Sequence, residues 1–228
     1  MPPEVTVNDP VATSASAEIV LDALEARVLG CLIEKAATTP DVYPLTLNAI
    51  HVACNQKSSR DPIMQAELGD VGHALRTLEE KKLVREVRGA RVLRYEHTVE
   101  SALNLKARAR AVLALLLLRG AQTQPELLTR SERLADFPDP ASLGDTVERL
   151  VAREPPLVVC VGRGSGQRED RYMHLLCGPV SAEAVLARRS ESGSGESGRA
   201  DLEARVEELE RLVAELQRRF ATQDGVPE

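Results

Sequence analysis

Aromatic residues are scarce in this sequence of 228 residues: they make up 2% of it, and tryptophan is absent. Hydrophobic residues nevertheless reach 43%, so the core must be built mainly from Leu, Val and Ala. Leu and Ala, together with the many Arg and Glu residues, favour helices. The length predicts one large domain or two small ones.

Long apolar runs are also missing. No stretch approaches the roughly 18 uncharged apolar residues that a membrane-spanning helix needs. The N-terminal segment MPPEVTVNDPVATSASAE is acidic and lacks the basic and apolar regions of a secretory signal. We therefore expect a cytoplasmic protein with no membrane partner.

Paired metal ligands are a third absence, because no Cys-x-x-Cys pair occurs. His51 and Cys54 lie three residues apart and could share a helix face, but no second pair completes a metal site and no third group orients them for catalysis. We expect reduced thiols that pack as small hydrophobic residues, no metal, no cofactor and no enzymatic activity. The cysteines are Cys31, Cys54, Cys160 and Cys177.

Charge is unevenly distributed along the chain, although its net value is -6. Residues 76–110 contain ten Lys and Arg against five Asp and Glu, a local net charge of +5. Residues 1–30 and 191–228 are acidic, with net charges of -4 and -5. A local basic block can bind a polyanion even in an acidic protein.

Apolar periodicity and turn signals predict a series of elements between residues 21 and 95. A helix begins at Leu21 and ends before Thr38, and an extended piece follows at Val42–Leu45 because the residue before a proline avoids the helical region. Thr46 caps a second helix. The remaining expected elements are helices Leu47–Cys54 and Asp70–Lys82 and strands Leu83–Val87 and Val92–Tyr95, joined at Gly89–Ala90. Three helices closed by a β-hairpin predict a winged helix.

The same pattern then recurs, which indicates an internal duplication. Helices are expected at Arg108–Gly120, Thr123–Thr129 and Leu143–Glu154, and a hairpin at Leu157–Arg163 and Asp170–Leu176. Val71, Leu75 and Leu78 correspond to Leu143, Val147 and Leu150, and the Tyr-x-His of 95–97 recurs at 172–174.

The predicted fold class is α+β, mainly helical, with two tandem winged-helix domains and a C-terminal amphipathic or coiled-coil helix. The expected regions are a disordered extension (1–18), winged-helix domains (19–102 and 103–180), a Gly/Ser-rich linker (181–199) and a heptad helix (200–221). The heptad stripe is either a homodimer contact or a face docked on the protein's own body. It consists of Leu202, Val206, Leu209, Val213, Leu216 and Phe220.

Long segments resemble a known family. LEARVLGCLIEKAATTPDVYPLTLNAIHVACNQKSSRDPIM, LLLRGAQTQPEL and RYMHLLCG are similar to the YceH-like family of bacterial tandem winged-helix proteins of unknown function. The resemblance covers about Leu21 to Phe220 and implies the tandem winged-helix fold, but it implies no activity. The acidic N-terminal extension and the Gly/Ser linker depart from the family pattern.

Double-stranded DNA is the partner that the basic block favours, which would make the protein a DNA-associated regulator. The connection NQKSSRDP and the hairpin would contact phosphates, and the third helix would reach base edges. The expected contacts are Lys57, Ser58, Ser59, Arg60, His73, Arg76, Thr77, Lys81, Lys82, Arg85, Arg88, Arg91 and Arg94 in the first domain, with Arg163 and Arg168 in the second.

A protein–protein interaction module without DNA binding is the alternative. Asp70 and Glu80 lie on the expected outer face of the third helix and would repel phosphates. The second domain is close to neutral, and its GRGSGQRED turn lacks the lysine and the following helix of a phosphate-binding loop. The sequence therefore leaves both kinds of partner open.

Overall fold

The computed structural model describes residues 19–88, 92–163 and 168–181, which form an α+β fold of helices and small antiparallel sheets. The described residues up to Val180 belong to one compact unit. The expected N-terminal extension, most of the linker and the heptad helix with its six stripe residues lie outside the described residues.

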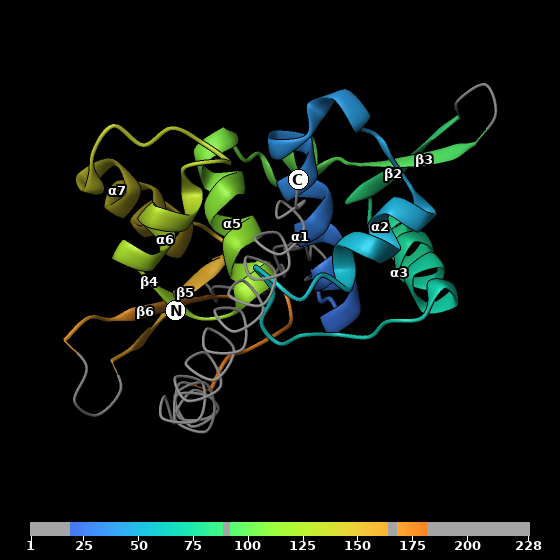
Figure 1. Ribbon diagram of the computed structural model, residues 1–228. Helices are drawn as coiled ribbons and strands as arrows, with labels where there is room; N and C mark the ends of the chain where they lie inside the picture. The colour runs from blue at the N-terminus through green and yellow to red at the C-terminus, as the bar shows by residue number, and fades with distance from the viewer. Residues whose placement is uncertain (1–18, 89–91, 164–167, 182–228) are drawn as a thin grey trace, which may run out of the picture. The chain divides into compact units, whose positions relative to one another are not determined.

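Repeat 1 (residues 19–102) has the order helix, strand, helix, helix, strand, strand (Figure 1). The sheet order is β1-β3-β2, with both pairings antiparallel. After the hairpin, a short helix that the sequence did not predict leads into repeat 2. The elements are α1 (Ala23–Thr38), the 3-10 turn η1 (Pro40–Val42), β1 (Leu45–Thr46), α2 (Leu47–Cys54), α3 (Leu68–Glu80), β2 (Val84–Arg88), β3 (Leu93–His97) and α4 (Val99–Leu103).

Repeat 2 (residues 103–180) has the same order and a sheet of order β4-β6-β5. Tyr95 opposes the first residue of β1, and Tyr172 opposes the first residue of β4, so the recurrence at 95–97 and 172–174 has a common register. The elements are α5 (Ala107–Arg119), β4 (Gln122–Thr123), α6 (Gln124–Ser131), α7 (Pro140–Val151), β5 (Val158–Gly162) and β6 (Arg171–His174).

Local chemistry explains several helix boundaries. Asp22 and Glu25 form a capping box at the start of α1, and Thr46 accepts a hydrogen bond from the backbone of Ala49 as the predicted cap of α2. The helix α3 ends two residues before the predicted position. Lys82 has a φ of 58° there, and the N–H of Leu83 donates to the carbonyl of Leu78, which closes the helix end.

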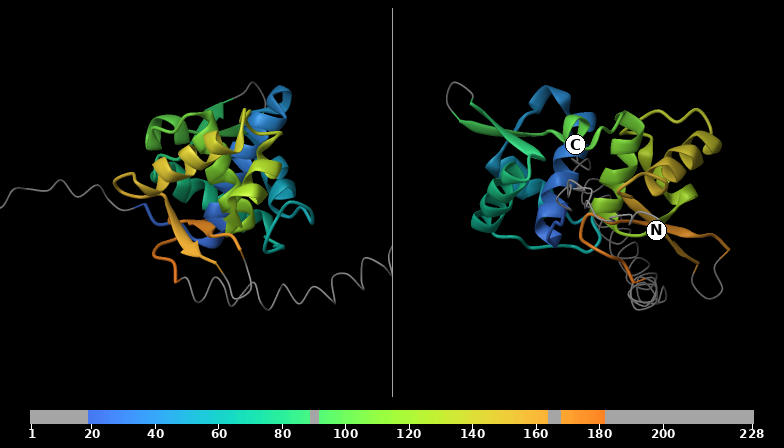
Figure 2. Two further views of the ribbon diagram at one scale, coloured as in Figure 1. Left: turned by 90° about the vertical axis from the view of Figure 1, so that its left-hand side faces the viewer. Right: turned by 180° about the vertical axis from the view of Figure 1, so that it is seen from behind.

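The two repeats pack through α1 and α5, which lie side by side at the centre of this unit (Figures 1 and 2). Gly30 allows the close approach, because a Cβ at this position would lie 2.9 Å from Cγ of Leu118. Backbone hydrogen bonds from Leu21 to Leu176 (2.6 Å) and from Asp61 to Leu118 (2.9 Å) also join the repeats. One continuous hydrophobic core therefore spans both repeats.

Candidate nucleic-acid interface

The connection between α2 and α3 is closed by its end residues. The side chain of Asn55 donates to the carbonyl of Ala66 (2.9 Å) and accepts from the N–H of Ala66 (2.8 Å). The ring Nε2 of His51 lies 2.9 Å from the same carbonyl. The two ends of the segment 56–65 therefore lie close together, as in a compact surface loop.

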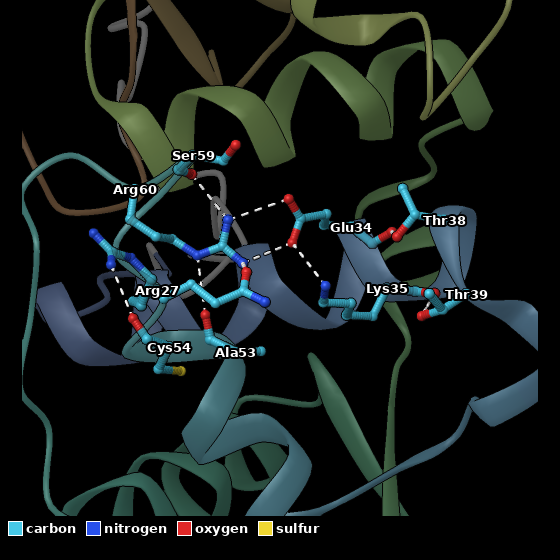
Figure 3. A network of polar contacts seen from close by, with 10 residues as sticks. Arg27, Glu34, Lys35, Thr38, Thr39, Ala53, Cys54, Ser59 and Arg60 are labelled. Atoms are coloured by element: carbon cyan, nitrogen blue, oxygen red, sulfur yellow. Dashed lines mark hydrogen bonds and ion pairs between the residues drawn. The ribbon is translucent and has the colours of Figure 1, made fainter. Parts of the chain in front are cut away.

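Arg60 anchors this loop from inside (Figure 3). Its side chain has no exposed surface, and its guanidinium bonds both carboxylate oxygens of Glu34, at 3.1 and 2.7 Å. It also donates to the carbonyl of Ala53 at 3.0 Å. Burial opposes the charge of Arg60, but its hydrogen bonds to Glu34 help to raise its pKa. The structure thus gives Arg60 the role of a loop anchor, and its buried guanidinium is unavailable to a phosphate.

Arg27 supports the same loop from α1. This side chain is also buried, and it donates to the carbonyls of Cys54 (3.2 Å) and Pro62 (2.6 Å). Burial lowers the pKa of Arg27. With the bond from Asp61 to α5, these contacts hold the loop against the helices that join the two repeats. Exposed Lys57, Ser58 and Ser59 lie on this loop, away from the β2–β3 hairpin (Figures 1 and 2).

The hairpin presents arginines on its exposed surface. Arg85 pairs with Glu96 across the strands, and Arg88, whose side chain is 90% exposed, lies 3.5 Å from Glu86. Arg94 is exposed and donates to the carbonyl of Pro44 at 2.7 Å. Such exposed pairs contribute little stability, so these arginines can exchange partners readily. Arg91 lies outside the described residues.

The outer face of α3 presents His73 and Arg76, both exposed. The hydroxyl of Thr77 donates to the carbonyl of His73 within the helix. Lys81 has a structural role, because its Nζ bonds Glu25 (2.6 Å) and the carbonyl of Val20 (2.7 Å) at the start of α1. Lys82 is exposed at the end of the helix.

The helix α3 contacts the edge strand β2 of the hairpin. The N–H of Glu86 in β2 donates to the side chain of Glu79 in α3 at 3.2 Å. A Cβ on Gly72 would lie about 4.0 Å from the guanidinium of Arg76 and 3.9 Å from Leu47 at the start of α2. Because side chains alternate along a strand, Arg88 lies on the same side of the hairpin as Glu86, whereas Arg85 and Arg94 lie on the other side. We name the exposed cations of α3 and of both sides of the hairpin the cationic face: His73, Arg76, Lys82, Arg85, Arg88 and Arg94.

Repeat 2 has a different charge on the equivalent surface. Arg163 and Arg168 are exposed on either side of residues 164–167. On α7, however, Asp145 and Glu148 occupy the positions that correspond to His73 and Arg76 and are exposed. The sequence had already indicated that the second domain is close to neutral, and the structure shows Arg149 exposed on α7 beside these two carboxylates.

The pair of His51 and Cys54 does not form a reactive site. Cys54 is fully buried, and so is its neighbour Cys31. The interaction with Cys31, together with burial, raises the pKa of Cys54. Within residues 19–88, 92–163 and 168–181, no cluster of three or more His, Cys, Asp or Glu side chains could hold a metal ion. Nor does this part of the chain contain a helix long and apolar enough to cross a membrane.

Comparison with known proteins places this architecture in a bacterial family. Residues 21–167 match the family described as "Protein of unknown function, DUF480". The chain is 53% identical over 208 residues to UPF0502 protein Smlt0097 of Stenotrophomonas maltophilia (strain K279a), which covers 90% of this chain and 95% of the relative. It is 52% identical over 206 residues to UPF0502 protein mll4256 of Mesorhizobium japonicum, and this alignment covers 90% of this chain and 97% of the relative. A UPF0502 protein of Pseudomonas syringae pv. tomato is 48% identical to this chain over 211 residues, and the alignment covers 92% of this chain and 95% of the relative. The chain therefore belongs to the DUF480 family, together with these UPF0502 proteins.

Proposed function

We propose that repeat 1 is a winged-helix domain that binds double-stranded DNA through α3 and the β2–β3 hairpin, and that the protein is a non-enzymatic cytoplasmic regulator. The order of its elements and the pairing of β1 with β3 beside the hairpin support the winged-helix assignment. Repeat 2 has the same order and pairing. The more specific resemblance to YceH-like proteins is part of this proposal.

The exposed cations of α3 and the adjoining hairpin carry the proposal. A helix of the α3 type fits the major groove, where His73 and Arg76 would meet base edges. Arg85 and Arg88 would contact the phosphates beside it, which fixes the register without reading sequence. Asp70 and Glu80 are exposed on α3 and limit the contact area that this helix offers to DNA.

Homodimerisation through the heptad stripe is also part of the proposal. Leucine and valine repeat there with a spacing of three and four residues, and a helix of about three heptads needs a partner to be stable. A dimer would present two copies of repeat 1 to two half-sites.

Fluorescence anisotropy of the full-length protein with a mixed-sequence duplex, titrated at several salt concentrations, tests the proposal. We expect binding whose affinity falls linearly with salt on a double-logarithmic plot. Arg76→Glu/Arg88→Glu should lower the magnitude of the slope by about two and weaken binding by roughly ten-fold or more at low salt.

Lys106→Glu/Arg133→Glu is the matched control, because both residues are exposed outside the cationic face and the net charge changes equally. It should have a much smaller effect, through net charge alone. Equal losses in both variants would mean that only the total charge matters. Absence of binding at low salt would sink the DNA assignment.

A protein partner is the second candidate, and exposed apolar side chains near the same hairpin favour it. Val42, Val92 and Leu93 are 57%, 56% and 40% exposed, and Arg94 links this region to η1 through the carbonyl of Val42. Exposed apolar groups at one place are typical of protein interfaces. A protein that co-purifies with the wild type and is lost in Val92→Glu would support this candidate.

A further inference from the structure

Two adjoining hollows lie on repeat 2. The first, of about 450 Å³, lies between α6, the start of α7 and the start of β6. The second, of about 430 Å³, lies between α6 and residues 135–140. They share Leu128 and Pro140, so together they form one groove. Such a groove can take a short peptide segment as well as a small molecule.

The floor of the groove is apolar and well supported. Leu128, Leu143 and Tyr172 line the first hollow, and Phe137 lines the second. The side chain of Gln124 donates to the hydroxyl of Tyr172 at 3.2 Å. Arg108 stacks over the ring of Phe137 at 5.7 Å and donates to the carbonyl of residue 136 at 2.8 Å. Such support fixes the shape of the groove before a ligand arrives.

The rim of the groove is acidic. Five carboxylate residues and no Lys or Arg are among the lining residues. One of them, Asp139, accepts a hydrogen bond from the N–H of Ser142 as the cap of α7. The other four are exposed and make no ion pair with any described cation: Glu132, Asp136, Glu169 and Asp170.

The charge of this surface is opposite to that of repeat 1. By the strand register, Glu169 and Asp170 occupy the positions of Val92 and Leu93. Glu148 takes the position of Arg76. Arg168 is exposed next to Glu169 but does not line the groove. The groove would therefore attract cations.

We propose that this groove docks a segment of a partner protein that combines aliphatic side chains with Lys or Arg. The aliphatic groups would bury against Leu128, Leu143 and Phe137, while the cations would meet the four free carboxylates. The inference does not rest on DNA binding by repeat 1, since it concerns a separate surface of opposite charge.

Fluorescence anisotropy with the full-length protein tests the inference. The probe is a labelled helical peptide of Leu and Lys, about 14 residues long, with Leu on one face. We expect saturable binding that weakens with salt and falls about ten-fold in Glu169→Lys/Asp170→Lys. Leu128→Ala should also weaken binding several-fold, without a change in charge.

Glu80→Lys/Glu154→Lys is the matched control, because both carboxylates are exposed, lie outside the groove and change the net charge equally. It should bind the peptide within about two-fold of wild type. Circular dichroism and urea unfolding establish that each variant is folded. A matching peptide of Leu and Glu should not bind.

Four results would overturn the inference: no binding of the Leu/Lys peptide, an equal loss in the control variant, equal binding of a Gly/Lys peptide, or displacement of the peptide from the groove by duplex DNA. A fifth such result would be self-association of the protein that Glu169→Lys/Asp170→Lys abolishes, because it would assign the groove to a second copy of the chain.

Discussion

The guanidinium of Arg60 lies where three parts of repeat 1 meet: α1, the end of α2 and the loop between α2 and α3. A charge in this position needs its partner, because an unpaired buried ion is far less stable than a hydrated one. Glu34 supplies two of its hydrogen bonds, and the carbonyl of Ala53 supplies another.

Arg60→Ala should lower the free energy of unfolding by about 3 kcal/mol, since it removes the nearer of the two cations of Glu34, leaves Lys35 at 3.9 Å, and leaves the loop without its anchor. Urea unfolding followed by far-UV circular dichroism measures this loss. Lys57→Ala, an exposed cation of the same loop, should change stability by less than about 0.5 kcal/mol. Similar losses in the two variants would remove the special role of Arg60.

His174 provides a test by pH. Burial lowers the pKa of His174 to about 4 in the folded protein, against about 6.5 in the unfolded chain. Below pH 6.5 the unfolded chain binds a proton that the folded protein does not, so stability is present above that pH and is lost as pH falls toward 4.

Between pH 7 and pH 5 this single group should lower the free energy of unfolding by about 2 kcal/mol. Urea unfolding at the two pH values, for wild type and His174→Leu, measures the contribution. The variant should lose correspondingly less stability over this range. The same pH dependence in both proteins would show that His174 is not the titrating group. Burial also lowers the pKa of His97 to about 4, so some dependence should persist in the variant.

At the scale of elements, the periodic helices and both hairpins could be predicted, because apolar spacing and caps such as Thr46 act locally. The strand β1 (Leu45–Thr46) was predicted only in part, as the extended piece at Val42–Leu45, of which Val42 instead ends the turn η1. The strand β4 could not be predicted, since it has two residues and depends on pairing with β6. The single-turn helix α4 is too short to produce a periodic signal.

For the candidate site, the sequence identified the exposed arginines of the hairpin but not the burial of Arg60 or the pairing of Lys81 with Glu25. A polar loop has the same composition whether its cations face solvent or turn inward. Whether each cation turns inward depends on its carboxylate partner in α1, which lies some 26 to 56 residues earlier in the chain.

The contact between α1 and α5 depends on Gly30. Gly30→Ala should lower the free energy of unfolding by about 1–2 kcal/mol, because overpacking against Leu118 outweighs the higher helix propensity of Ala. Gly69→Ala in α3 is the control, since a Cβ at that position meets nothing within 4 Å. It should leave stability unchanged or raise it by up to about 1 kcal/mol. Urea unfolding compares the two, and a stabilised Gly30→Ala would contradict the close contact.

At the scale of the whole molecule, one supersecondary pattern occurs twice with different charges at corresponding surface positions. The surfaces of the two repeats are equivalent in geometry. Tyr95 and Tyr172 have the same strand register, and Gly72 lies next to Leu47 as Gly144 lies next to Gln124. Arg76 on one and Glu148 on the other show that they differ in charge. Duplicated domains that differ in surface charge are suited to different partners, as proposed here for DNA and for a cationic protein segment.

The most direct test compares how much each repeat contributes to the binding of duplex DNA. The measurement is the salt dependence of anisotropy for full-length wild type, Arg76→Glu/Arg88→Glu in repeat 1 and Arg163→Glu/Arg168→Glu in repeat 2. The account predicts a slope reduced by about two in the repeat 1 variant and nearly unchanged in the repeat 2 variant. An unchanged slope in the repeat 1 variant, or a larger loss in the repeat 2 variant, would contradict it.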